Sequence, residues 1–213
     1  MFTPYAIMYL NFITSMQNPN TLYLYQYNLS ALPLTTPYQL TDYELTKCLR
    51  LPQTQQETYR LTRYIIRDVL NQHGISPQQL YYATTGKPLL NSTFSISLSH
   101  SESILLIAIM KTEKLGIDVQ IPLPKNKQTL LARLNLPGTI SDASLLQHWT
   151  LIESYCKCMQ KPLLSTLSMP IKTLINNENL FMITRAQPFT FSAVSTSTIK
   201  KTRLIPQKSA FDG

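Results

Sequence analysis

Three charged side chains stand within apolar stretches of this sequence, where their types and spacing could support chemistry. Asp118 lies in LGIDVQ, and Glu153 and Lys157 lie one helical turn apart in WTLIESYCK. A carboxylate in a buried strand costs free energy unless a cation or hydrogen bonds compensate for it. One carboxylate from a strand and one from a helix can hold Mg²⁺, which completes its octahedron with water and substrate phosphates. The three residues therefore suggest a magnesium site beside a phosphate.

Each of these signals also has a plainer interpretation. Glu153 and Lys157, four positions apart, form a pair that stabilises a helix by ~0.2–0.5 kcal/mol. Asp118 taken alone is equally well explained as a polar residue that caps a strand end. Gly116 favours the binding interpretation, because it removes a side chain next to Asp118 and would let a ligand approach the backbone closely.

A row of arginines lies on a long predicted helix. Thr54-x-x-Glu57 is a capping-box pattern, and we expect it to open a helix that closes at Gly74. Apolar residues at helical spacing line one face of this helix: Leu61, Ile65 and Val69. Basic residues at i, i+3 and i+7 line another: Arg60, Arg63 and Arg67. This arginine face is either a solvated surface or a phosphate-binding surface.

The remaining elements follow from hydrophobic periodicity. We expect strands at 21–29, 94–99, 104–110 and 115–120, a capped helix at 41–49 and a second long helix at 141–160. The strand at 94–99 would bury only its Phe, Ile and Leu face, and the next two strands would form a hairpin through KTEK. The segments PIKTLI, LFMITRA and FTFSAVSTS are interpreted as strands, and the tail from Ile199 as frayed. This pattern predicts an α+β fold of two pseudo-related subdomains, 1–106 and 107–213.

The composition narrows the class of partner. The chain has 213 residues, 44% hydrophobic and 14% charged, which is enough apolar material for a core and argues against global disorder. Its formal charge of +8 favours a negatively charged partner: nucleic acid, a phosphate-rich small molecule or an acidic protein. Nucleic acid is the weakest of the three, since basic stretches lack interleaved aromatics and no RNA or DNA motif is present.

Targeting signals and cysteines indicate a soluble, cytoplasmic protein. The apolar N-terminal segment 1–17 lacks the basic region that begins a signal peptide. The longest apolar run, 104–110, is far shorter than the ~20 residues that span a bilayer. The chain has an odd number of cysteines without CxxC spacing, so we expect reduced thiols. They are Cys48, Cys156 and Cys158.

Four short motifs in chain order carry a resemblance to a known family. They are GKP (86–88), SLSHS (97–101), GID (116–118) and W-x3-ES-x2-K (149–157). In this order and spacing the set resembles the Sfp-type 4′-phosphopantetheinyl transferases. The resemblance implies two pseudo-twofold-related α+β subdomains in a monomer. It also implies an enzyme that moves phosphopantetheine from coenzyme A to a serine of an acidic acyl- or peptidyl-carrier protein, releasing adenosine 3′,5′-bisphosphate, with no nucleic-acid or membrane partner.

The resemblance also assigns roles to individual positions. Asp118 and Glu153 would hold Mg²⁺, with Gln120 as a further candidate ligand. Glu153 would in addition be the general base for the carrier serine. Lys157 would neutralise charge on the transferring phosphate or the leaving group. The residues that would contact coenzyme A are Lys87, Pro88, Ser99, His100, Arg63 and Arg67, and by extension Arg60.

Three positions depart from the family pattern. Ile152 replaces a lysine, which removes a cation near the phosphates unless an arginine or Lys161 substitutes. Gln120 replaces an acid that often follows the strand motif, and Gln160 replaces a glycine after the helix. These differences leave a second hypothesis open, in which the chain is a degenerate paralogue that binds coenzyme A or a carrier protein without turnover.

Overall fold

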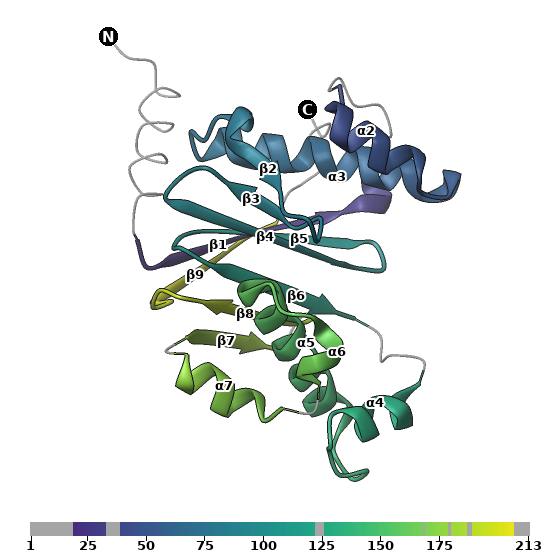
Figure 1. Cartoon of the computed structure of the whole chain (residues 1–213), viewed down its shortest axis with the longest axis vertical. Coiled ribbons are helices and arrows are strands. Elements are labelled where there is room, and N and C mark those ends of the chain that lie inside the picture. The colour runs from purple at the N-terminus through teal and green to yellow at the C-terminus, as the bar shows by residue number, and fades with distance from the viewer. Residues whose placement is uncertain are drawn as a thin grey trace.

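Two β-sheets lie face to face, and one long helix covers the outer face of each (Figure 1). The computed structural model describes residues 19–32, 39–121, 126–167, 169–178, 180–186 and 189–206. The predicted α+β class is confirmed. Among the helices of these ranges, none has the length and apolarity that crossing a bilayer requires. The N-terminal segment 1–17, considered above for targeting, lies outside the described residues.

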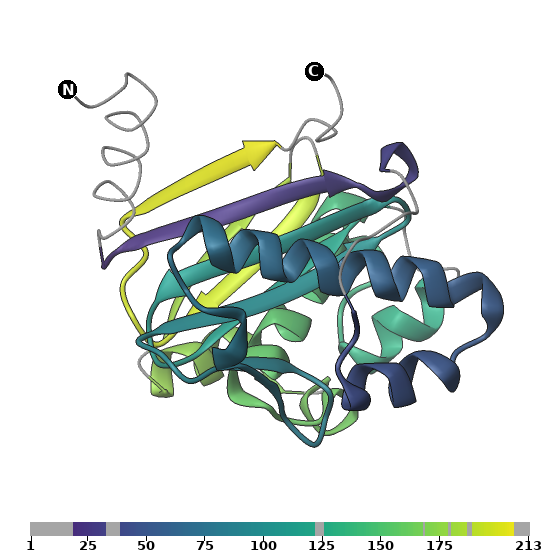
Figure 2. The same cartoon turned by 90° about the horizontal axis from the view of Figure 1, so that it is seen from above.

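The first sheet has the strand order β4-β5-β1-β9. Its strands are β1 (Thr21–Asn28), β4 (Phe94–Ser101), β5 (Ile104–Lys111) and β9 (Lys201–Pro206). β1 is antiparallel to β5 and parallel to β9, which lies along its other side (Figure 2). The prediction of a frayed tail is therefore wrong for β9, because its backbone groups pair with those of β1.

The helix α3 (Gln53–Gln72) covers the outer face of the first sheet through the predicted apolar stripe. It begins earlier than expected, after Pro52, and no side chain caps it. The capping box predicted at Thr54 is therefore wrong, since Pro52 holds the N-cap position and Thr54 lies inside the first turn of the helix. The preceding helix α2 (Asp42–Leu49) is capped as expected. Its cap is a capping box, in which Thr41 Oγ1 and Glu44 Oε2 accept from each other's backbone N–H groups.

The second sheet has the strand order β6-β8-β7. Its strands are β6 (Leu115–Gln120), β7 (Phe181–Arg185) and β8 (Thr190–Ser195), and α5 (Asp142–Met159) packs on it. The other elements are the 3-10 turns η1 (Leu29–Ala31) and η2 (Pro77–Gln79), a ribbon of β2 (Leu80–Tyr82) and β3 (Pro88–Leu90), and the helices α4 (Lys127–Arg133), α6 (Leu163–Thr166) and α7 (Ile171–Asn177). PIKTLI was expected as a strand, but it belongs to α7, because Ile171 and Ile175 bury one helical face in the core under α5.

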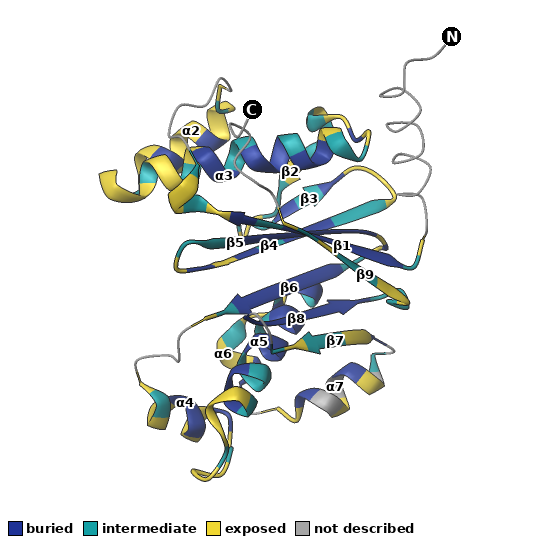
Figure 3. Cartoon of the chain, turned by 180° about the vertical axis from the view of Figure 1, so that it is seen from behind, coloured by how far each residue is buried: buried dark blue, intermediate teal, exposed yellow. Residues whose placement is uncertain are grey.

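The two sheets share an apolar interior, seen as buried strands in the middle of Figure 3. β5 and β6 stand on opposite sides of it, so the predicted hairpin is wrong: KTEK carries the chain from one sheet to the other. The serine face of β4 is buried as well, contrary to expectation. Ser97 Oγ accepts from Ile117 N at 3.0 Å and Ser101 Oγ from Ile121 N at 3.1 Å, so both serines hold β4 against β6.

The predicted boundary between 106 and 107 falls inside β5, which pairs along its length with β1 and β4. In the structure the chain passes between the two layers after β5 and returns to the first layer with β9. Local periodicity identifies strands but not the sheet to which each belongs, which is why the sequence boundary differs.

Candidate active site

The helix α5 and the strand β6 approach each other closely at Gly116. A Cβ atom at this position would lie 1.9 Å from Ser154 O and 2.4 Å from Cys158 N. The space beside Gly116 is therefore filled by the helix backbone, and the expectation that a ligand occupies it is wrong. The glycine matters because it lets α5 lie directly on the strand that carries Asp118.

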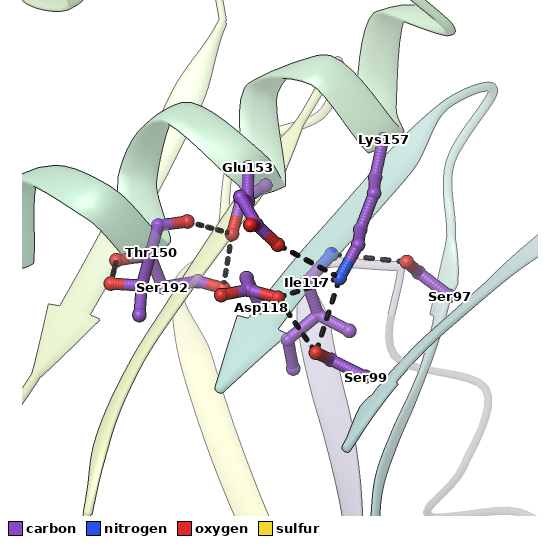
Figure 4. Close-up of polar contacts among 9 residues, drawn as sticks. Ser97, Ser99, Ile117, Asp118, Thr150, Glu153, Lys157 and Ser192 are labelled. Atoms are coloured by element: carbon purple, nitrogen blue, oxygen red, sulfur yellow. Dashed lines mark hydrogen bonds and ion pairs between the residues drawn. The ribbon is translucent and has the colours of Figure 1, made fainter. Parts of the chain in front are cut away.

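Polar contacts fix the rotation of α5 about its own axis. Ser154 Oγ lies 2.7 Å from the carbonyl oxygens of both Thr150 and Ser192, to either of which it can donate. Thr150 Oγ1 lies 2.8 Å from Ser192 Oγ on β8. With Thr150 and Ser154 directed at Ser192 of the second sheet, the neighbouring Glu153 points toward Asp118 (Figure 4).

Asp118, Glu153 and Lys157 meet as one cluster (Figure 4). Asp118 is only 2% exposed, and its Oδ1 accepts from Lys157 Nζ at 2.6 Å and from Ser99 Oγ at 2.7 Å. Lys157 Nζ also donates to Ser99 Oγ at 3.1 Å and lies 3.8 Å from Glu153 Oε2. Two carboxylates that are distant along the chain thus share one ammonium group.

The environment raises the pKa of Glu153 to about 7. Burial contributes most, because it disfavours the charged form, and the nearby Asp118 carboxylate adds to it. The Lys157 ammonium acts in the opposite direction but does not cancel these effects. A carboxyl group with such a pKa can accept a proton near neutral pH.

The two carboxylates fit a hard divalent cation. Asp118 Oδ2 is buried and accepts no hydrogen bond within the described part of the chain. No group of three or more His, Cys, Asp or Glu side chains is gathered there, so further ligands for Mg²⁺ would come from water and substrate phosphates. Gln120, two residues beyond Asp118, shares its face of β6 but does not line the cavity described next.

A cavity of about 560 Å³ opens beside the cluster. It lies where the turn before β3 approaches the last turn of α5, and a ligand of cofactor size fits such a volume. Its lining residues include Arg63, Gly86, Lys87, Pro88, Ser97, Glu153, Cys156, Lys157, Gln160 and Lys161. Of the residues expected to contact coenzyme A, it therefore contains Arg63, Lys87 and Pro88.

Lys87 and Arg63 both line the cavity, but Lys87 is held by hydrogen bonds and Arg63 by stacking on aromatic rings. Lys87 Nζ donates to Leu115 O at 2.9 Å and to Lys157 O at 2.5 Å, and burial lowers its pKa. Two of the three donors of its ammonium are thus used to join β6 and α5. The Arg63 guanidinium stacks on Tyr59 and Tyr82, at 4.4 and 5.2 Å from their ring centroids. Its Nε has no hydrogen-bond partner among the described residues.

The structure does not bring the other expected contacts to the cavity. Arg67 is buried, and its Nη2 pairs with Glu44 Oε2 at 2.5 Å. Arg60 is exposed on α3. His100 is exposed at the end of β4, and its side chain points to the face opposite Ser99. Ser99 itself touches Asp118 and Lys157 and does not line the cavity.

Two partners of the arginines on α3, Glu44 and Tyr82, had no signal for this role in the sequence. Glu44 accepts from both Arg67 and the Tyr82 hydroxyl, and Arg63 donates to Tyr82 Oη at 3.3 Å. These partners are far apart along the chain, so only the fold shows that they belong together.

Two departures from the family pattern have a local explanation. Ile152 is 3% exposed and packs in the apolar core under α5, so this position does not face the cavity. Lys161 does line the cavity, but its ammonium is paired with Glu178 at 2.6 Å. Gln160 has a φ of +54° at the end of α5, the left-handed conformation that favours the glycine seen in the family.

Comparison with known proteins gives one informative match. No family model matches the chain. A stretch of 114 residues is 30% identical to "4′-phosphopantetheinyl transferase HetI" from Nostoc sp., covering 45% of this chain and 48% of that protein. The chain thus aligns with about half the length of this curated relative. Together with the ordered motifs at Lys87, Ser99, Asp118 and Glu153, this similarity supports membership of the chain in the 4′-phosphopantetheinyl transferase family.

Proposed function

We propose that the chain is a magnesium-dependent enzyme that transfers 4′-phosphopantetheine from coenzyme A to a serine of an acyl- or peptidyl-carrier protein. The observation that carries this proposal is the meeting of Asp118 and Glu153 beside Lys157 at a cavity of cofactor size. We expect it to act in the cytoplasm as a monomer, and its charge of +8 suits an acidic carrier surface.

Glu153 acts as the general base in this reaction. It removes the proton from the carrier serine hydroxyl, directly or through water. The serine oxygen forms a bond to the phosphorus that carries pantetheine. The bond from that phosphorus to the bridging oxygen of the diphosphate breaks, and adenosine 3′,5′-bisphosphate leaves.

The remaining charged residues stabilise the negative charge of the reacting groups. Mg²⁺, when held by Asp118 and Glu153, would neutralise the diphosphate and so lower its repulsion of the nucleophile. Lys157 would stabilise charge on the transferring phosphate or the leaving group. Arg63 and the unused donor of Lys87 face the same cavity and would orient the phosphates of coenzyme A.

The test is transfer of a fluorescent phosphopantetheine from labelled coenzyme A to a panel of apo carrier proteins, with and without Mg²⁺. We expect Asp118→Ala and Glu153→Ala each to lower the rate at least ~100-fold. Asp142→Ala removes an exposed carboxylate at the start of the same helix and should leave the rate unchanged. A rate within about threefold of wild type in either site variant would refute the assigned roles.

A second candidate function is binding without turnover. Gln120 in place of an acid and Ile152 in place of a lysine favour it. Calorimetry with coenzyme A, with and without Mg²⁺, beside the transfer assay separates the two. Binding of coenzyme A by a protein that labels none of the carriers would support the second candidate.

A further inference from the structure

Lys157 occupies a position that has the chemistry of a cation site. Its ammonium is surrounded by oxygen atoms: Asp118 Oδ1 at 2.6 Å, Ser99 Oγ at 3.1 Å and Glu153 Oε2 at 3.8 Å. Oxygen atoms, carboxylates above all, are the ligands that hard divalent cations prefer. The ammonium therefore stands where the two carboxylates converge.

Asp118 Oδ1 cannot bind the Lys157 ammonium and a divalent metal ion at the same time. Oδ1 already accepts two hydrogen bonds, from Lys157 and Ser99, which use both of its lone pairs. A doubly charged ion on either oxygen would also lie close to the ammonium and repel it. The like charges separate most easily if the Lys157 side chain moves, since it is longer and more exposed than the side chains of Asp118 and Glu153.

Lys157 has the freedom to move. Its side chain is 31% exposed, against 3% for Asp118, and it lines the cavity. It stands in the last turn of α5, on a flexible four-carbon stem that can change rotamer while the backbone stays fixed. The cavity into which it can turn is the one that would hold the phosphates.

We infer that Lys157 is an internal cation, which holds Asp118 and Glu153 together in the metal-free protein and gives up Asp118 to a divalent cation, turning to the phosphates of coenzyme A. This inference rests on the proposed function. It has a thermodynamic consequence: metal and coenzyme A bind cooperatively, since the phosphates offer Lys157 the partner that the metal takes from it. Without coenzyme A, Lys157 opposes metal binding.

The test measures binding of Mn²⁺, a paramagnetic substitute for Mg²⁺, to the free protein by electron paramagnetic resonance at pH 8.5. We expect Lys157→Met to bind Mn²⁺ at least ~10-fold more tightly than wild type. Lys161→Met is the matched control, because it removes the same charge from the same cavity. The ammonium group of Lys161 pairs with Glu178 and not with the two carboxylates of the site. Lys161→Met should bind Mn²⁺ within about threefold of wild type.

Coupling gives a second readout that does not depend on turnover. In wild type, Mn²⁺ should raise the affinity for coenzyme A at least ~10-fold. In Lys157→Met this factor should be at least ~3-fold smaller, because only the direct coordination of the phosphates by the metal remains. Lys157→Gln, which keeps a donor for Asp118, is measured in parallel, and thermal unfolding establishes that both variants are folded. Mn²⁺ affinity that is equal or weaker in both folded variants would overturn the inference.

The outcomes separate this inference from the proposed function. Equal Mn²⁺ affinity in wild type and Lys157→Met, with carrier labelling intact in wild type, would leave the function standing and remove only the role of Lys157. If wild type and both variants bound no Mn²⁺ at millimolar concentration, the metal site itself would be wrong, and the inference with it. Asp118→Asn, expected to weaken Mn²⁺ binding, identifies the site that is measured.

Discussion

Glu153 is the residue whose chemistry depends most on its neighbours. On an exposed helix it would be an ordinary carboxylate that pairs with the lysine one turn later. Here burial and the Asp118 carboxylate make its ionised form unfavourable, and Lys157 offsets this only in part. The same three charges thus set both the proton affinity of the base and the attraction for a cation.

At the residue scale we predict that Glu153 titrates near pH 7 in the metal-free protein. Carbon-13 NMR of the glutamate carboxyl carbons should show this midpoint, and Glu153→Gln should remove it. Asp118→Asn should lower the midpoint, because it removes a neighbouring negative charge. A Glu153 midpoint near 4.5 in wild type would contradict the environment described.

The same pKa shift has a consequence for stability. Because the pKa of Glu153 is raised above its ordinary value of 4.5, the stabilisation linked to its proton is complete below pH 4.5 and is lost as the pH rises through about 7. Denaturant unfolding of the metal-free protein should show this loss in wild type and not in Glu153→Gln.

The reactive residues could be predicted from the sequence because they are charges in apolar segments. Their partners could not. Arg67 was expected at the phosphates, yet its guanidinium pairs with Glu44, which a different helix buries at the same place. A one-dimensional pattern shows which residues share a helical face but not which other element covers that face.

At the element scale the contact of β6 with α5 depends on one missing side chain. We predict that Gly116→Ala lowers the free energy of unfolding by ~3 kcal/mol, because the added Cβ would overlap backbone atoms of α5. The displaced helix would also carry Glu153 away from Asp118 and lower the transfer rate by more than ~10-fold. Urea denaturation and the carrier-labelling assay measure the two effects.

Gly138→Ala is the control for this substitution. A Cβ at Gly138 would meet no atom within 4 Å, and this glycine lies outside the site. We expect the free energy of unfolding of Gly138→Ala to stay within ~1 kcal/mol of the wild-type value. Similar losses in both variants would show that the close approach at Gly116 is not what matters.

The elements themselves were predictable where local chemistry decides them. The strands at 94–99 and 104–110 and the helix at 141–160 are confirmed within one or two residues. The errors have tertiary causes: the helix α7 forms where a strand was expected, because its isoleucines pack under α5, and the expected hairpin is divided between two sheets.

At the scale of the whole molecule, Lys87 joins the two layers next to the site. It reaches from the turn before β3 to carbonyl groups of β6 and α5. We predict that Lys87→Met lowers the free energy of unfolding by ~1–3 kcal/mol even without coenzyme A, because it leaves two carbonyl groups unpaired. Thermal and denaturant unfolding of the ligand-free protein provide the measurement.

Lys114→Met is the comparison, since Lys114 is half-exposed and, among the residues that the structure describes, forms its ion pair with the exposed Glu113 at 3.9 Å. Its unfolding free energy should stay within ~0.5 kcal/mol of wild type. Equal stability of the Lys87→Met and Lys114→Met variants would show that the contacts of Lys87 with Leu115 O and Lys157 O do not stabilise the fold.

The pairing of β9 with β1 bears on how the protein is made. Among the described strands β1 is the first to leave the ribosome, whereas β9, which pairs with its other edge, is the last of them to be translated. During synthesis β1 therefore presents an unpaired edge, and such edges are templates for pairing with other chains. Ribosome-bound chains that end before residue 201 should therefore bind chaperones more strongly than chains that include β9.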